Sequence, residues 1–380
     1  MSSVTATAAL PAGLRAHDDP IAGWLLDGPA QLGTGPHAGT VVGGIDADGC
    51  ATYAYPEIAG YYLQWLAWRH RRNDAAGVLA PRARAVQGWL RAQLAPGSPL
   101  PTRLHLSGGV DDWRNHAQFC FDLAMVLRGV SAATNAGLLV PDARVVAGIV
   151  SAMERLIAAD GMFDAYSPPG ASVKMPLRWS TRRGGFLAKA AAGVIVAAAL
   201  PGMSPRVLAA AEASWLASVD AALDRPHDEL HPQLYAFEGI LSLPKHPRTV
   251  AALPQVAAAF DSLLELGTQP GATSRGALPE RRSADIAAPG PERVDVIAQM
   301  LRVGHLLQRH LPAWVPDRVA LARLRNLLVE QIRADGSVPF AIAEATPSAN
   351  VWAAMFADQA LAFALPSRIG DAYLTDPLIV

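Results

Sequence analysis

The stretch YPEIAGYYLQWLAWRHRR, residues 55–72, decides the fold class of this chain. Proline in the first turn and Glu57 beside the positive end are typical of a helix start. Further apolar stretches with helical spacing follow along the chain, so the sequence predicts an all-α protein. The composition, 51% hydrophobic and 17% charged, suits helices that are buried on more than one side.

The other expected helices cover about 79–95, 113–130, a stretch after 141–142 that ends by 161, 183–200, 204–223, 232–243, 248–266, 291–310, 316–333 and 350–365. Asp111 and Asp112 are expected to cap the helix around 113–130. The C-terminal tail is expected to complete the series without a full helix. Short extended pieces are expected at 104–106 and 338–341.

Loops of alternating length separate these helices. Short loops fall near 73–78, 137–140, 201–204, 244–247 and 310–315, and long ones near 96–110, 160–182, 224–232, 266–292 and 334–349. In an up-down series of helices, this alternation places every long loop at the same end. The polar first turns of alternate helices centre near 57, 116, 184, 235, 295 and 352, a period of roughly 50–65 residues.

We therefore predict an (α/α)6 toroid, in which six hairpins close into a double ring and the inner helices start at one mouth. Residues 51–380 are expected to form this toroid, and 1–50 an extension that packs on it. A straight α-solenoid is the alternative, but it would not need a polar cluster at every inner-helix start.

Charge and composition exclude several classes of function. The formal net charge of −1 argues against nucleic acid or a membrane surface as an electrostatic partner. Cys50 and Cys120 are too few for a disulfide scaffold. The N-terminus lacks the features of a signal peptide, and the apolar run 190–200 is about half the length that spans a bilayer. We expect a soluble, cytoplasmic protein that needs no cofactor or metal.

Segments at the starts of the expected inner helices carry a resemblance: YPEIAGY (55–61), FD (121–122), RWSTR (178–182), HP…Y…EG (231–239), RVDV…Q…R (293–302) and NVW…MF…QAL (350–361). Together they resemble bacterial polysaccharide-biosynthesis proteins of the six-hairpin toroid type. That class is related in fold to six-hairpin glycosidases, polysaccharide lyases, sugar 2-epimerases and glucuronyl C5-epimerases. The resemblance implies the fold, a saccharide substrate and polysaccharide-pathway partners, but it does not fix the reaction.

Glu57 is the first candidate for a catalytic carboxylate. Tyr61 lies one turn further on the same face, so acid and phenol are expected to point together into the barrel. The helix dipole favours an ionised carboxylate there, which suits a base or nucleophile. The alternative is a helix-terminal charge with no catalytic part. Tyr55 beside it suits stacking on a sugar.

Glu238 is the expected partner of Glu57, and it follows two more catalytic candidates, His231 and Tyr235. Tyr235 and Glu238 are i,i+3 neighbours on one helix face. A glutamate in the apolar run YAFEGIL is rarely buried without a partner. Burial would raise its pKa, so we expect Glu238 to be the protonated acid of the pair. The alternative is a structural ion pair with an arginine of a neighbouring inner helix.

Two i,i+4 pairs are expected deeper in the ring. Asp122 is paired with Gln118, and the catalytic candidate Asp295 with Gln299, beside Arg293. Hydrogen bonding across the ring is favoured for Asp122, and contact with a ligand for Arg293.

A basic cluster, Arg178, Arg182 and Arg183 with Trp179, lies in a long loop. Arginine binds carboxylates through two parallel hydrogen bonds and tryptophan stacks on sugar faces, so the cluster indicates an anionic saccharide such as a uronate. Surface arginines without a ligand are the alternative. Further candidates for substrate binding are Tyr55, His105, Asp122, Gln299, Asn350 and Trp352.

Two motif-like strings are set aside. His227 and His231 are spaced i,i+4, but the glutamate between them is not where the zinc-protease pattern requires it. Asp111 and Asp112 faintly resemble the magnesium-binding acids of terpene synthases, but no second metal motif accompanies them. Helix capping explains these aspartates.

Three functions remain open. The favoured one is a carbohydrate-active enzyme of exopolysaccharide or capsule metabolism that cleaves or epimerises an acidic, uronate-type saccharide by acid/base chemistry. The second is a non-catalytic saccharide-binding or assembly protein of a polysaccharide pathway. An isoprenoid or terpene cyclase is the least favoured.

Overall fold

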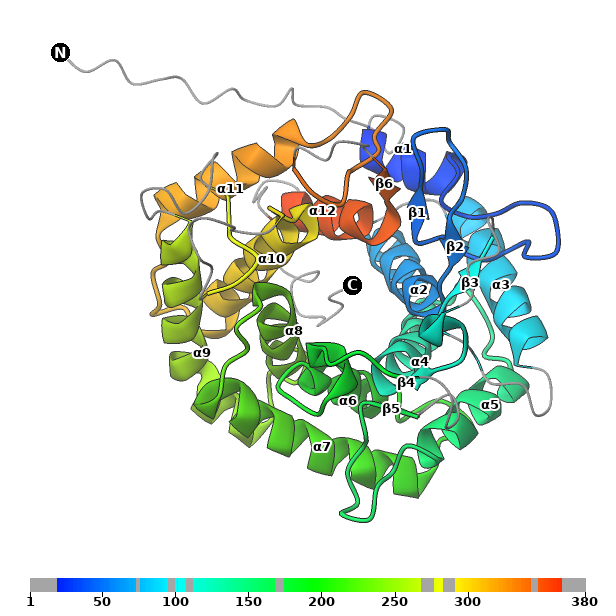
Figure 1. Cartoon of the computed structure of the whole chain (residues 1–380), viewed down its shortest axis with the longest axis horizontal. Helices are drawn as coiled ribbons and strands as arrows, with labels where there is room; N and C mark the ends of the chain where they lie inside the picture. Colours follow the sequence, from blue (N-terminus) through cyan, green and yellow to red (C-terminus); the bar gives the residue numbers. More distant parts are fainter. Residues whose placement is uncertain are drawn as a thin grey trace.

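The computed structural model describes residues 19–72, 76–94, 100, 102–106, 112–167, 174–267, 277–282, 291–342 and 348–363. Within these residues, the helices form two concentric rings (Figure 1). The inner ring consists of α2 (Pro56–Arg71), α4 (Cys120–Asn135), α6 (Leu187–Val196), α8 (Leu230–Leu241), α10 (Val294–His310) and α12 (Val351–Phe363). The outer ring consists of α1 (Pro20–Asp27), α3 (Ala76–Gln93), α5 (Ala143–Glu154), α7 (Pro205–Asp224), α9 (Pro247–Leu266) and α11 (Arg318–Glu330).

The predicted (α/α)6 toroid is confirmed. Each inner helix packs against the next one, and α12 packs against α2, which closes the ring and excludes a straight solenoid. The outer place next to α12 is taken by α1, which lies between α11 and α3 in Figure 1. We expected the C-terminal tail to complete the ring, but residues 364–380 lie outside the described part of the chain.

The inner helices are buried on nearly all sides, as the apolar composition predicted. The helices α2 and α4 are in close contact where two glycines meet: a Cβ at Gly60 would overlap the backbone of α4, and one at Gly129 would overlap Gly60. The backbones of these two helices are therefore in direct contact where the helices cross. Their first turns, which carry Glu57 and Asp122, are brought close together as a result.

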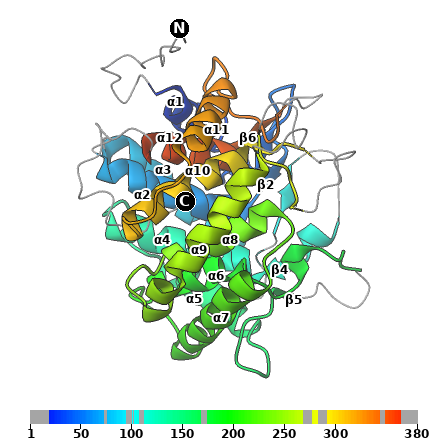
Figure 2. The same ribbon diagram turned by 90° about the vertical axis from the view of Figure 1, so that its left-hand side faces the viewer.

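Short antiparallel strand pairs lie in the loops on one side of the ring (Figure 2). They join β1 (Gly44–Ile45) to β6 (Ala349–Asn350), β2 (Tyr53–Ala54) to β3 (Leu104–His105), and β4 (Gln118–Phe119) to β5 (Tyr166–Ser167). The expected extended pieces are found in β3 and in single bridges at Pro339 and Ala341. Because these pairs tie inner-helix starts to loops far away in sequence, they fix the shape of the mouth.

The start of α4 differs from the prediction. Asp112 caps only a 3-10 turn, η2 (Trp113–Asn115), and the chain then extends through β4 before α4 begins. Gln118 therefore lies on a strand and forms no i,i+4 helix pair with Asp122. Pairing of β4 with β5, and stacking of Phe119 on Tyr166 at 5.7 Å, hold this segment extended. Similarly, α6 is preceded by the 3-10 turn η3 (Trp179–Thr181) and runs only from 187 to 196, shorter than the expected 183–200.

Among the described residues, one helix, α9, is long and apolar enough to cross a membrane by length and composition. Its apolar side chains Leu253, Phe260 and Leu263 are buried in the toroid. The helix is thus accounted for as part of the outer ring.

Candidate functional site

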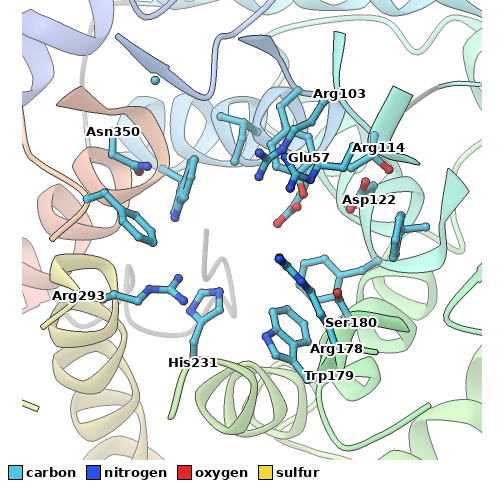
Figure 3. A pocket seen from close by; sticks show the side chains of 18 of the residues that line it. Glu57, Arg103, Arg114, Asp122, Arg178, Trp179, Ser180, His231, Arg293 and Asn350 are labelled. Carbon is cyan, nitrogen blue, oxygen red and sulfur yellow. The ribbon is translucent and has the colours of Figure 1, made fainter. Parts of the chain in front are cut away.

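A cavity of about 870 Å³ opens at the mouth where the inner helices begin. Ten of the predicted site residues line it: Tyr55, Glu57, Asp122, Arg178, Trp179, His231, Tyr235, Arg293, Asn350 and Trp352. Six do not: Tyr61, His105, Arg182, Glu238, Asp295 and Gln299. Figure 3 shows His231 and Arg293 on the side of the cavity opposite to Glu57 and Arg103.

Glu57 and Asp122 form a buried carboxyl pair on one wall. Asp122 hydrogen-bonds to Glu57, and the phenols of Tyr55 and Tyr61 also reach the Glu57 carboxyl. Burial raises the pKa of Glu57, and burial together with the Glu57 charge raises the pKa of Asp122 well above its usual range. Two carboxyls this close do not both ionise readily, which favours a proton shared between them. One Asp122 oxygen, Oδ2, has no hydrogen-bond partner among the described residues.

Burial acts on Glu57 against the dipole of α2. The dipole was expected to favour the ionised carboxylate, whereas burial raises the pKa of Glu57. A terminal helix charge is favoured by about 0.3–1 kcal/mol when it is exposed. Desolvation of a buried carboxyl is the larger effect.

His231 lies across the cavity on the first turn of α8. Its ring packs against Tyr235, with ring centres 4.2 Å apart, and against Trp179 at 5.9 Å. Burial and the nearby Arg293 charge lower the pKa of His231 to about 3, so the imidazole is neutral at physiological pH. A neutral imidazole carries one N–H and one basic nitrogen.

A hydrogen-bond relay decides which His231 nitrogen is basic. The Gln299 Nε2 group donates to Glu238 at 3.4 Å, which turns the Gln299 Oε1 atom toward His231 Nδ1, 2.6 Å away. Nδ1 therefore carries the hydrogen and donates it to Gln299. The basic nitrogen is Nε2, on the edge of the ring away from the relay.

Glu238 itself is buried beneath the cavity, where Lys189 Nζ lies 2.7 Å from Oε2 and Arg302 contacts Oε1. Burial alone would raise the pKa of Glu238, but the positive charges of Arg302 and Lys189 hold it below its ordinary value. The expectation of a protonated acid at the mouth was wrong, and the alternative, an ion pair with an arginine of a neighbouring inner helix, holds.

Lys189 is fully buried at the centre of the ring. Its ammonium group lies 4.7 Å from the ring centre of Tyr61 and 4.5 Å from that of Tyr235, whose hydroxyls are 3.2 Å apart. Burial lowers the pKa of Lys189 to about 7, although Glu238 opposes the shift. Tyr61 is therefore part of the floor beneath the cavity and not of its surface.

Asp295 is also removed from the cavity. Its carboxylate binds Arg293 at 2.6 Å and the indole N–H of Trp352 at 3.0 Å, and it lies 3.7 Å from His231 Nδ1. Burial would raise the pKa of Asp295, but the Arg293 charge keeps it below its usual range. Asp295 thus holds Arg293 and Trp352 in place. Of the remaining candidates, His105 packs edge-on against Tyr53 at 6.0 Å, and Arg182 is exposed.

Several residues that line the cavity were not predicted from the sequence, chiefly Arg103, Arg114 and Trp113. Arg103 stacks on Tyr53 and Tyr55, with its guanidinium 4.3 and 5.2 Å from the two ring centres. The arginine and aromatic residues around 53–55 and 103–114 could have indicated a sugar-binding surface. The sequence alone did not show that these two segments are in contact, because the contact depends on the pairing of β2 with β3.

No protein-family model and no curated protein sequence matches the chain. Solved structures do match in fold. A D-mannose isomerase is 14% identical with a TM-score of 0.65, and the match covers 91% of this chain and 96% of that one. A cellobiose 2-epimerase from Spirochaeta thermophila is 14% identical with a TM-score of 0.62, over 90% and 94% of the two chains. An unsaturated glucuronyl hydrolase specific for heparin is 12% identical with a TM-score of 0.56, over 86% and 90%.

These neighbours are six-hairpin enzymes, and the expected relation in fold to glycosidases and sugar epimerases is confirmed. At such low identity the likeness concerns the fold alone. The expected link to polysaccharide biosynthesis stays a prediction.

Proposed function

We propose that this protein is a sugar-processing enzyme that moves a proton at a saccharide carbon next to a carbonyl group, as an epimerase or isomerase does. The observation that carries the proposal is the placement of two complementary proton-transfer groups across one cavity. His231 offers a basic nitrogen with a fixed tautomer, and the Glu57–Asp122 pair holds a transferable proton.

The chemistry uses these groups in turn. Nε2 of His231 takes the proton from the carbon, and the electrons of the broken C–H bond move toward the carbonyl, whose oxygen takes a proton from the carboxyl pair. The epimer forms when the carbon takes a proton on its other face and the new hydroxyl returns its proton to the carboxyl pair. The isomer forms when the neighbouring carbon takes the proton from His231 and the hydroxyl on that first carbon gives its proton to the carboxyl pair, which leaves the carbonyl group there. General acid–base groups of this kind accelerate a reaction typically 10²–10⁴-fold each.

Hydrolysis of a glycosidic bond is supported less well. The two carboxyls of a hydrolase flank the bond about 5–10 Å apart, whereas Glu57 and Asp122 are hydrogen-bonded to each other. Glu238 and Asp295 do not line the cavity and are paired with Arg302 and Arg293, and Glu229, which does line it, is paired with Arg281. The fold neighbours include a D-mannose isomerase and a cellobiose 2-epimerase, which supports the proton-transfer reaction, and a glucuronyl hydrolase, which keeps cleavage as the competing outcome.

The substrate class we propose is an anionic saccharide. Five arginines line the cavity: Arg103, Arg114, Arg178, Arg281 and Arg293. Arg281 and Arg293 are paired with Glu229 and Asp295, so the first three supply the positive charge for a ligand. Trp179 and Trp352 provide aromatic surface for the sugar. The uronate expected from the sequence and a sugar ester of phosphate or sulfate both satisfy this charge. The role in exopolysaccharide or capsule metabolism and the cytoplasmic location remain predictions.

The proposal is tested by incubating the protein with a panel of reducing mono- and disaccharides, neutral and anionic, and following the products by proton NMR. We expect a new epimer or ketose from at least one anionic member. Release of a free sugar from a disaccharide would replace the proposal by hydrolysis. Binding of a sugar with no conversion of any member would favour the non-catalytic binding protein.

A further inference from the structure

Three arginines converge on the cavity wall beside the carboxyl pair. Arg103 precedes β3, Arg114 belongs to η2, and Arg178 precedes η3. All three line the cavity, and Figure 3 shows their side chains directed into it near Glu57. Burial and the charge of Arg103 lower the pKa of Arg114, and Arg178 adds to this effect, as expected for guanidinium groups at close range.

Hydrogen bonds to the backbone fix the positions of these three arginines. The Arg103 N–H donates to the Arg114 carbonyl at 3.1 Å, and the Asn115 side chain donates to the Arg103 carbonyl at 3.2 Å. The Arg178 N–H donates to Thr181 Oγ1 at 3.0 Å. The three guanidinium groups thus approach one place from segments that are each fixed locally.

Aromatic rings hold two of the guanidinium groups. Arg103 stacks on Tyr53 and Tyr55, and Arg114 lies 5.0 Å from the Trp113 ring centre. Stacking fixes a guanidinium group through its face and leaves its N–H groups available. Arg103 Nε is buried and has no hydrogen-bond partner among the described residues. A buried N–H without a partner costs about 1–3 kcal/mol, unless a ligand satisfies it.

Carboxyl groups lie close to these arginines but do not cover them. Asp112 lies 3.2 Å from Arg114, and Glu57 and Asp122 are hydrogen-bonded to each other, which disfavours a second negative charge on that pair. An anionic ligand would be attracted to the guanidinium groups here.

We propose that Arg103, Arg114 and Arg178 form a subsite for a tetrahedral oxyanion, the phosphate or sulfate ester group of a sugar. A planar carboxylate is satisfied by one arginine, which grips its two oxygens. A phosphoryl or sulfuryl group instead presents three terminal oxygens, which suit donors that arrive from three segments. The inference rests on the proposed function, because it names the substrate class of the same cavity.

The test is isothermal titration calorimetry with glucose 6-phosphate, glucose 6-sulfate, glucuronate and glucose. We expect the esters to bind at least about 10-fold more tightly than glucuronate or glucose, the size of one charged hydrogen bond. Arg178→Gln and Arg103→Gln should each weaken binding of the esters about 10-fold, and by a larger factor than binding of glucose. Binding of one ester only identifies which of the two anions the subsite takes.

The matched control is Arg183→Gln. Arg183 belongs to the same loop region but is paired with Asp160 and Asp164, at 2.5 and 2.9 Å, and does not line the cavity. This variant should bind the esters like the wild type. Equal affinity for all four sugars, no binding of either ester, or unchanged ester binding in both Arg103→Gln and Arg178→Gln would overturn the subsite.

The outcome also separates the subsite from the proposed function. If the esters bind through the arginines but no sugar is converted, the proton-transfer reaction fails and the subsite stands. If sugars are converted but the wild type shows no preference for esters over neutral sugars, the reaction stands and the subsite fails.

Discussion

Substitution of Glu238 by glutamine tests the buried ion cluster beneath the cavity. Glu238 is fully buried and neutralises Lys189 and Arg302, which are fully buried as well. Glutamine keeps the shape but removes the charge. Removing one partner of a buried ion pair costs about 3–5 kcal/mol, because the other charge is left uncompensated.

The two cations respond differently to this loss. Burial already lowers the pKa of Lys189 to about 7, so Lys189 can give up its proton when Glu238 is neutral. Arg302 cannot, because guanidinium does not deprotonate in proteins. We therefore expect the lower end of the range, about 3 kcal/mol. For 380 residues this corresponds to a fall in Tm of about 4 °C.

The assay is urea unfolding followed by circular dichroism for the wild type, Glu238→Gln, Lys189→Met and the double variant. If the cost arises from uncompensated cations, the double variant should lose less stability than the sum of the two single variants. A loss below about 1 kcal/mol in Glu238→Gln would refute the reasoning. Unchanged stability with turnover reduced about 10²-fold would instead restore Glu238 as the catalytic acid.

Three further predictions concern the relay, the far end of the ring and its packing. Gln299→Leu should lower kcat about 10-fold or more with KM little changed, because His231 loses the acceptor that fixes its tautomer. The control is Gln64→Leu, since Gln64 is buried on α2 and hydrogen-bonds within its own helix, and this variant should keep the wild-type kcat. Both values are measured by steady-state kinetics. Burial and the charge of a neighbouring aspartate raise the pKa of Asp358 to about 7, so the folded state holds this proton more tightly than the unfolded state, and stability should fall as the pH rises from about 4 to 7. Asp358→Asn should flatten that dependence in urea unfolding, and an equal slope in both proteins would contradict it. Gly60→Ala should cost about 1–3 kcal/mol, because its Cβ overlaps the backbone of α4; a wild-type Tm would show that the helices can separate freely.

Much of the fold was predictable because features that can be read from the sequence also determine how the helices are arranged. Alternating loop lengths and polar inner-helix starts are features of the chain itself, and they placed Glu57, His231 and Asn350 correctly at one mouth. The start of α4 was missed because Asp112 is a good cap for any helical turn. Only the pairing of β4 with β5, about 48 residues away, decides that the turn is short.

The roles within the site were harder to predict than its location. Glu238 was identified as a buried glutamate, but whether such a group is acid or ion-pair partner depends on what lies opposite. Its partner Lys189 is 49 positions away, in an alanine-rich run that carries no other charge. Glu57 shows the same limit, since burial beside the neighbouring helix raises its pKa. Helix periodicity gives the face of a residue on its own helix but not its neighbour on the next one.

Removal of a carbon-bound proton by His231 can be followed by incubating wild type and His231→Asn with a convertible sugar in D₂O, and measuring deuterium at the carbon next to the carbonyl by NMR. We expect incorporation by the wild type and a rate at least about 10²-fold lower in the variant, with sugar binding kept. Incorporation at the wild-type rate in His231→Asn, or a cleaved glycosidic bond with no deuterium at that carbon, would contradict it.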